Sequence, residues 1–335
     1  MLADACATGD PRAAHRPDVA RAPRARRRGL HVLALFGIAI VAVALLPGTA
    51  HAWTPGTHIF LGEAVLRSLG QLPQHVAELL SAFPHEFLYG SVAADTSIAK
   101  KYAPVGRHCH SWHVGFEIFE EARDERLRAF GLGYLAHLAA DSVAHNFFVP
   151  RYLAITAMLS GLGHSYWESR FETHLGPAFS RRAREVVLLD HSRADEHLDR
   201  ILSPTIFSTR TNRRIFRGMV YVTDTESWQR IFQLAADNSR RDLGSTDVAR
   251  YMERSYDYIL DLLKRTDRSE PFALDPSGDE ALRLAKRVRR EAQRSGMAIR
   301  VAEEAGRRFA LPESTLKFAA DLPEPLYPPA SSESN

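Results

Sequence analysis

Cysteine is scarce in this chain of 335 residues, which contains only Cys6 and Cys109. Alternating strand-like hydrophobicity is also scarce, and the sequence has no internal repeat and no long Gly/Ser linker, so nothing divides it into separate domains. It lacks the GxSxG elbow of serine esterases and the Walker loop of nucleotide hydrolases, which argues against both classes. What the chain does contain is a large number of helix-period patterns and 15 histidines.

The N-terminal segment has the form of a signal peptide. A basic region over residues 21–28 precedes an apolar run from Leu30 to Leu46, and the small-residue site Ala50-His51-Ala52 follows. We therefore expect residues 1–52 to be cleaved near Ala52 and the protein to be secreted or periplasmic. An uncleaved membrane anchor is the alternative, because the apolar run approaches the length of a short spanning helix. Cleavage would leave Cys109 as a lone thiol, unable to form an intramolecular disulfide.

Charge is nearly balanced once this leader is set aside. The full chain has 43 basic and 40 acidic residues, and its first 52 residues hold seven arginines and three aspartates. The processed chain would therefore keep 36 basic and 37 acidic residues, which shows no overall bias toward nucleic acid or anionic membranes. The run KRVRR in the segment from Glu280 to Ala305 is either a phosphate contact or, as we favour, a solvated helix face.

Hydrophobic periodicity predicts an all-α protein, a single multi-helix bundle over residues 53–312. The final residues, 313–335, are rich in Pro and Ser and are expected to be disordered. The predicted helices are Ile59–Leu69, Ala77–Ala82, Phe116–Phe130, Leu132–Phe147, Tyr166–Phe179, Trp228–Ala236, Val248–Leu263 and Glu280–Ala305.

The segment GYLAHLAADSVAH carries the strongest functional signal. His137, Asp141 and His145 are each four residues apart, so they drift only about 40° per step around one helix and share a face that is otherwise apolar. Burial of three ionisable groups without a partner would cost several kcal/mol. A divalent cation accepts imidazole nitrogen and carboxylate oxygen together, so a metal site is favoured over a structural network.

Further metal-type side chains surround this helix in the sequence. His164 and Glu168 repeat the four-residue spacing downstream, and His58 lies five residues after Trp53 at the expected processed terminus. Upstream of the central helix, Asp95 precedes a loop with three histidines in six residues, which is typical of metal binding. Those histidines are His108, His110 and His113.

The order of these motifs resembles the zinc-dependent phospholipase C family, which includes the clostridial alpha-toxin and the phosphatidylcholine-preferring enzymes of bacilli. Trp at the processed terminus, GTH, GSxxxD, HxW, HxxxDxxxH and HxxxE follow one another over roughly residues 53–175. The HxxxDxxxH spacing is also similar to the N-terminal domain of glycosylphosphatidylinositol-specific phospholipase D. Beyond this stretch only the helical character is shared, and no C-terminal β-sandwich of the toxin type is apparent.

The resemblance implies a cluster of three zinc ions. The first two ligand sets are Asp95, His110, His137 and Asp141, and then His145, His164 and Glu168. The third ion takes the free α-amine and carbonyl of Trp53, with His58 and the other oxygen of Asp141, so removal of the leader would complete the site.

Two ligand choices stay open. In the toxin-like members a longer stretch separates the Asp from the following His, which makes His145 less secure than His137. The HxW context favours His110 over His108 and His113.

The implied activity is a phospholipase C that hydrolyses glycerophospholipids to diacylglycerol and a phosphorylated headgroup by metal-activated water. Asp95 would combine zinc ligation with general-base action, and phospholipid at a membrane surface would be the partner. Two alternatives remain: a zinc-dependent single-strand nuclease, disfavoured by the near-neutral charge, and a non-catalytic zinc-binding envelope protein. No specific nucleic acid and no protein partner is expected.

Overall fold

The computed structural model describes residues 53–98, 100–104, 106–156, 160–225, 230, 243–295 and 298–327. These residues all lie in one compact unit, Ala42–Asn335, and within them the chain forms helices and turns without a β-strand. The all-α prediction is confirmed. None of the described helices is both long and apolar enough to cross a membrane. The predicted signal peptide, residues 1–52, lies outside the described residues.

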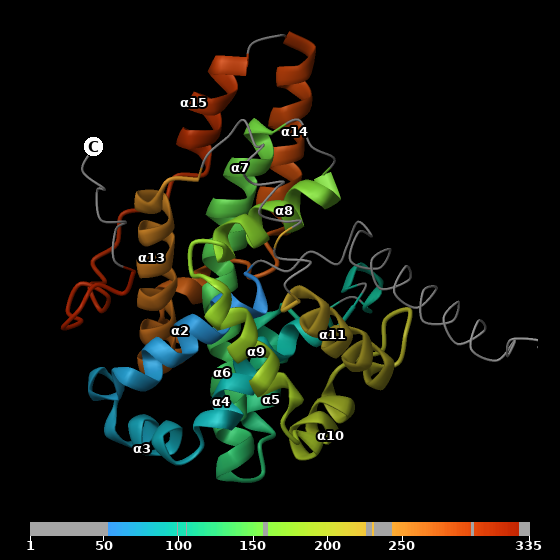
Figure 1. Ribbon diagram of the computed structural model, residues 1–335, viewed down its shortest axis with the longest axis vertical. Helices are drawn as coiled ribbons and strands as arrows, with labels where there is room; N and C mark the ends of the chain where they lie inside the picture. The colour runs from blue at the N-terminus through green and yellow to red at the C-terminus, as the bar shows by residue number, and fades with distance from the viewer. Residues whose placement is uncertain are drawn as a thin grey trace, which may run out of the picture. The chain divides into compact units, whose positions relative to one another are not determined.

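Several 3₁₀ turns lie between the described helices, and Figure 1 shows the arrangement. The helices are α2 (Pro55–Arg67), α3 (Gln74–Ala82), α4 (Pro84–Ala93), α5 (Trp112–Glu120), α6 (Glu125–Val143), α7 (Val149–Ile155), α8 (Ser160–Glu172), α9 (Pro177–Leu188), α10 (Ser192–Ile201), α11 (Thr209–Thr223), α13 (Ser245–Arg265), α14 (Asp279–Ser295) and α15 (Ala298–Arg308).

Helix α6 is the central element, with α4, α5 and α13 packed around it (Figure 1). Every residue of α6 from Ala129 to Val143 is buried, which explains its weak amphipathic pattern. Helix α4 crosses α6 at a pair of glycines, because a Cβ built on Gly133 would lie 3.0 Å from the Cα of Gly90. The two backbones therefore touch, and the site residues on both helices are brought close together.

Three predicted helices are wrong in extent. Phe116–Phe130 is divided between α5 and α6, because the Asp124 side chain accepts a hydrogen bond from Leu127 N at 3.0 Å and caps the start of α6. Tyr166–Phe179 is divided between α8 and α9, where Gly176 has a φ of 81° and Pro177 begins the next helix. Glu280–Ala305 is two helices, α14 and α15. Of the predicted helix Trp228–Ala236, all but residue 230 lie outside the described residues.

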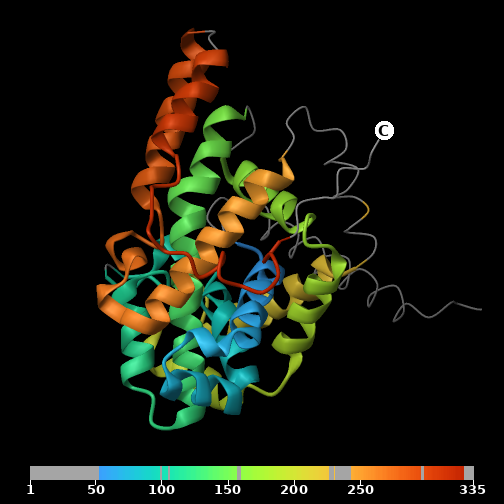
Figure 2. The same cartoon turned by 90° about the vertical axis from the view of Figure 1, so that its left-hand side faces the viewer.

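Helix α6 does not end at the site but runs into a π-helical turn, Ala144–Phe148, and then into α7. Such turns insert an extra residue and re-aim the side chains that follow. Helices α14 and α15 pack on α7 and on each other (Figure 2). The turn thus connects the central helix to the C-terminal helix pair.

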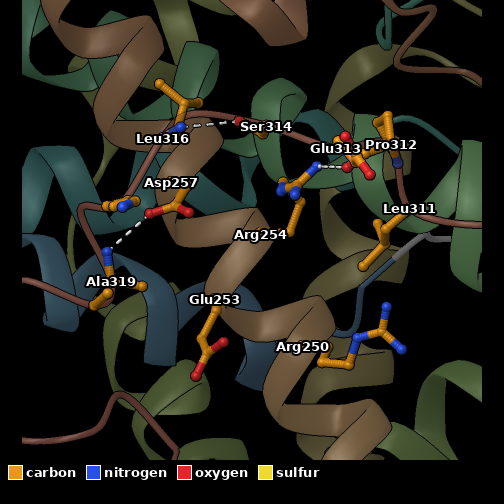
Figure 3. Close-up of a pocket in the computed structure, with 12 residues that line it drawn as sticks. Arg250, Glu253, Arg254, Asp257, Leu311, Pro312, Glu313, Ser314, Leu316 and Ala319 are labelled. Atoms are coloured by element: carbon orange, nitrogen blue, oxygen red, sulfur yellow. Dashed lines mark hydrogen bonds between the residues drawn. The ribbon is translucent and has the colours of Figure 1, made fainter.

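The segment after α15 has no regular helix but packs against α13. Ala319 N donates to Asp257 Oδ1 at 2.8 Å, and Arg254 donates to the carbonyl of Pro312 at 2.7 Å. These contacts border a cavity of about 540 Å³, drawn in Figure 3. Residues 313–327 of the predicted disordered tail are therefore placed against the bundle, and residues 328–335 lie outside the described part.

Candidate metal centre

His137 and Asp141 project from α6 toward α4 and are 1% and 0% exposed. The Nδ1 atom of His137 lies 2.8 Å from the carbonyl of Ser91, so that nitrogen donates and fixes the ring. Its Nε2 atom then points at Asp141 Oδ2, 3.1 Å away. A ring held through one nitrogen with the other turned toward a carboxylate is the arrangement expected of a metal-ligating histidine.

Asp95 and His110 approach the same point from the opposite side. Asp95 lies in the 3₁₀ turn Ala94–Thr96, which directly continues α4, and His110 lies just before α5. His110 Nε2 is 2.9 Å from Asp141 Oδ2 and 3.5 Å from Asp95 Oδ1. It is also 3.1 Å from His137 Nε2. The structure thus brings together the four side chains predicted to hold the first ion.

His58 adds a third wall from α2. Its Nε2 lies 3.2 Å from Asp141 Oδ1, and its ring stacks on that of His137 at 3.9 Å between centroids. Trp53 is fully buried, and its indole nitrogen donates a hydrogen bond to the carbonyl of Ala140 at 3.1 Å. That hydrogen bond anchors Trp53 beside Asp141. The predicted free α-amine depends on cleavage after residue 52, which lies outside the described residues.

His145 belongs to a second group, with His164 and Glu168 of α8. The donor atoms of these three residues lie within 4.8 Å of one another, and His164 Nε2 is 2.7 Å from Glu168 Oε1. His145 lies in the π-helical turn that follows α6, and its Nδ1 is 4.0 Å from Asp141 Oδ2. The structure thus places His145 with the partners that the resemblance implied.

The loop before α14 supports His145 from outside. His145 Nδ1 donates to the carbonyl of Pro276 at 2.6 Å, and Asn146 Nδ2 donates to the carbonyl of Asp275 at 2.8 Å. Gly278, with a φ of 59°, lies directly against the His145 backbone, where an added Cβ would overlap it. The loop before α14 therefore contacts the candidate metal centre directly, although no metal-type motif of the sequence indicated this contact.

The other two histidines of the loop lie farther out. His108 is partly exposed, and its Nδ1 accepts a hydrogen bond from His110 N at 3.1 Å. Burial and the neighbouring His110 lower the pKa of His108 to about 4. His113 is exposed on α5. His110 is therefore the member of the trio whose ring reaches Asp95 and His137.

Lys100 is the buried site residue that the sequence reasoning missed. It is 6% exposed, and its Nζ lies 2.9 Å from Asp95 Oδ1 and 3.1 Å from His110 Nε2. Burial alone would lower the pKa of Lys100, but Asp95 and other acidic neighbours outweigh it and raise that pKa. The available signal was a lysine five residues after Asp95, a spacing that marks no known metal motif.

The electrostatics of the centre call for added positive charge. Burial raises the pKa of Glu168 well above its usual value, and the carboxylates of Asp95 and Asp141 raise it further. Burial opposes ionisation of Asp141 as well, but His137 and the other adjacent imidazoles hold its pKa well below the ordinary range. Of these three carboxyl groups, that of Asp95 lies in salt-bridge contact with the buried Lys100 ammonium, at 2.9 Å.

The contacts at Asp141 fit a bound cation. Imidazole nitrogens lie 2.9–3.2 Å from both of its oxygens, yet within the described part of the chain neither oxygen accepts a hydrogen bond of acceptable geometry. A buried carboxylate in that state is costly unless a cation lies between it and the nitrogens. Among the described residues, four groups have donors close enough for an ion: His58, His137 and Asp141; Asp95, His110 and His137; His145, His164 and Glu168; and an outer group of His108, Cys109 and His110.

Residues 57–206 match the family described as zinc dependent phospholipase C. This segment belongs to that family. It contains every predicted ligand except Trp53, and it contains Lys100 as well. No match was found among curated proteins or among solved structures. The zinc-dependent phospholipase C segment is therefore all-α, and its clustered histidines and carboxylates offer several candidate zinc sites.

Proposed function

We propose that the protein is a secreted or periplasmic phospholipase C that hydrolyses glycerophospholipids to diacylglycerol and a phosphorylated headgroup. The observation that carries this proposal is the convergence of five buried histidines and three buried carboxyl groups inside the family segment. Its elements come from α2, the turn after α4, the start of α5, α6 and α8, so the fold has to assemble the centre. A purely structural role would not require so many ionisable groups to be buried together.

Three of the four donor groups, all except His108, Cys109 and His110, are the residues that would hold zinc. The number of ions stays a prediction. Zinc supplies Lewis-acid chemistry when bound: it neutralises phosphate oxygens and lowers the pKa of water. His137 Nε2, with Nδ1 fixed on Ser91, is oriented before any ion arrives. Asp141, whose pKa is held low, places a negative charge among the imidazoles, and a bound cation would favour ionisation of the Glu168 carboxyl group. Asp95 is the proposed general base.

Aromatic side chains near the centre contribute mainly to the core. Phe148 and Trp167 are fully buried, and Tyr152 is 4% exposed. Phe148 packs on Trp53 at 5.0 Å between centroids, and Tyr152 packs on Trp167 at 4.5 Å. These rings hold the helices that carry the ligands. Trp112, Phe147 and Tyr166 are only partly buried, so the preference for a lipid phosphodiester over single-stranded nucleic acid rests on the family match and on the near-neutral charge.

A paired substitution tests the proposal. His137→Ala removes a donor shared by two of the three groups, so zinc content should fall and hydrolysis of phosphatidylcholine should drop by a factor of about 10³ or more. His113→Ala is the matched control, because this histidine is exposed on α5 and should leave both properties unchanged. Turnover retained by His137→Ala would refute the assignment.

The unmodified secreted protein separates the alternatives. Its N-terminus, its zinc content and its activity on phosphatidylcholine and single-stranded nucleic acid are measured side by side. Hydrolysis of the nucleic acid alone would support the single-strand nuclease hypothesis. Bound zinc without hydrolysis of either substrate would favour a non-catalytic zinc-binding envelope protein. An N-terminus other than Trp53 would exclude the third predicted zinc site.

A further inference from the structure

Helix α14 carries a basic stripe on its exposed face, defined as Arg283, Lys286, Arg287, Arg290 and Arg294. At about 100° per residue, these five positions fall within about 100° of one another around the helix. All five side chains are exposed. The processed chain is nearly neutral as a whole, so this stripe is a local concentration of charge.

The acidic residues of α14 do not cancel the stripe. Asp279 and Glu280 lie in the first turn, where carboxylates stabilise a helix N-terminus. Arg283 pairs with Asp279 at 3.9 Å, with both side chains 72% exposed, so that pair is weak. Glu291 lies at the margin of the stripe. From Lys286 to Arg294 the exposed face is basic.

The opposite face of α14 is already occupied. Ala285 and Val288 are buried, and Leu282 packs against the core beside α7. The helix therefore cannot turn its apolar side outward to insert into a bilayer without leaving the bundle. Helix α14 can therefore bind a membrane surface only through electrostatic contacts between its basic side chains and lipid phosphate groups.

The stripe is rigidly connected to the metal centre. Its helix starts at the loop in which Pro276 accepts a hydrogen bond from His145 and Gly278 packs on the His145 backbone. A surface bound by α14 would consequently take a defined orientation relative to His145. Helix α14 contains no aromatic residue, so it lacks the stacking platforms of proteins that bind single-stranded nucleic acid.

We infer that the basic stripe docks the protein on anionic phospholipid surfaces and presents the metal centre to them. This inference deepens the proposed function, on which its choice of a lipid partner rests. Five basic residues near an anionic surface act together, each contributing about fivefold to partitioning. The attraction decays over a Debye length of about 10 Å at 0.1 M salt, so docking is reversible and sensitive to salt.

The test replaces all five stripe residues by Gln, which preserves helix propensity. The matched control replaces five exposed arginines on other elements by Gln, with the same change in net charge: Arg123, Arg181, Arg210, Arg214 and Arg268. Co-sedimentation is measured with vesicles of equal parts phosphatidylcholine and phosphatidylglycerol, and with vesicles of phosphatidylcholine alone. Zinc content and turnover of a water-soluble phosphodiester are measured in parallel.

We expect the unmodified protein and the control to bind the mixed vesicles at low salt, and the stripe variant to bind at least about a hundredfold more weakly. Zinc content and soluble turnover should be equal in all three. Equal vesicle binding by the stripe variant, equal binding of the unmodified protein to neutral vesicles, or no binding at all would overturn the inference. Stripe-dependent binding to a DNA homopolymer without vesicle binding would also overturn it.

Vesicle binding does not require turnover, so the two proposals can fail separately. Absence of soluble turnover with intact vesicle docking would refute the phospholipase activity and leave the docking surface standing. Normal turnover of the soluble phosphodiester without stripe-dependent docking would refute the docking surface and leave the proposed hydrolase activity standing.

Discussion

The glycine contact between α4 and α6 makes a sharp test of how packing sets the metal centre. In Gly133→Ala, the new methyl group would meet the carbonyl carbon of Phe87 at 2.9 Å and its oxygen at a still shorter distance. Normal contacts between carbon and oxygen are about 3.3–3.6 Å. Both partners are backbone, so neither can rotate away, and the helices must separate by about 1 Å.

The consequences can be estimated from neighbouring distances. His137, one turn beyond Gly133, holds Ser91 O at 2.8 Å across the same crossing, and a shift of about 1 Å would break that hydrogen bond. Overpacking costs about 1–3 kcal/mol and the lost hydrogen bond about 1 kcal/mol, while Ala regains up to about 1 kcal/mol of helix propensity. We expect a net loss of about 1–3 kcal/mol, or about 2–12 °C in Tm.

Differential scanning calorimetry of zinc-loaded and chelator-treated protein, with zinc content by mass spectrometry, measures both effects. The matched control is Gly306→Ala in α15, where an added Cβ meets no atom within 4 Å and should be neutral or slightly stabilising. Zinc content should fall in Gly133→Ala only. Equal melting and equal zinc content in the two variants would refute the reasoning that the glycine crossing sets the centre.

Two further predictions concern charge. Lys100→Met removes the ammonium that contacts the predicted zinc ligands Asp95 and His110 and would repel a cation there. Zinc affinity measured by titration calorimetry should therefore rise about tenfold or more. Weaker zinc binding would show instead that the lysine supports the site. Burial raises the pKa of Asp257 from 3.8 to about 6, so the folded state binds the proton more tightly and stability falls as pH rises through that window. Asp257→Asn keeps an oxygen that can accept the hydrogen bond from Ala319 N. The Tm of this variant relative to the unmodified protein should rise from about pH 4 to about pH 6. A Tm difference that does not change with pH would contradict the raised pKa of Asp257.

Periodicity predicted some helices with one buried face but not all of them, since α10 and α11 each bury one face and were not predicted. Helix α13 was predicted nearly to its ends because its apolar and polar faces are distinct. Helix α4 was missed because its residues from Phe87 to Ala93 are all buried, so its sequence carries no helical alternation. The break between α5 and α6 was missed because it depends on a single capping residue, Asp124.

For the candidate site, spacing within one helix was sufficient for some residues and not for others. His137 and Asp141 share a face in any regular helix, as do His164 and Glu168, because the turn angle alone requires it. The assignment of His145 to the latter pair depended on the resemblance, since local spacing does not show which residues of α8 approach the turn that carries His145. Lys100 was missed because only the fold directs its side chain inward.

The sequence by itself determined the helical class, the local pairing of ligand types and the family of residues 57–206, since these depend on composition, short-range spacing and motif order. Tertiary structure decided which groups meet. It joined α2, the turn after α4 and α8 to the central helix, added an ammonium to the carboxylates, and attached the basic helix α14 to His145 through residues more than 130 positions away. Such contacts depend on long-range packing of buried surfaces, which local patterns do not encode.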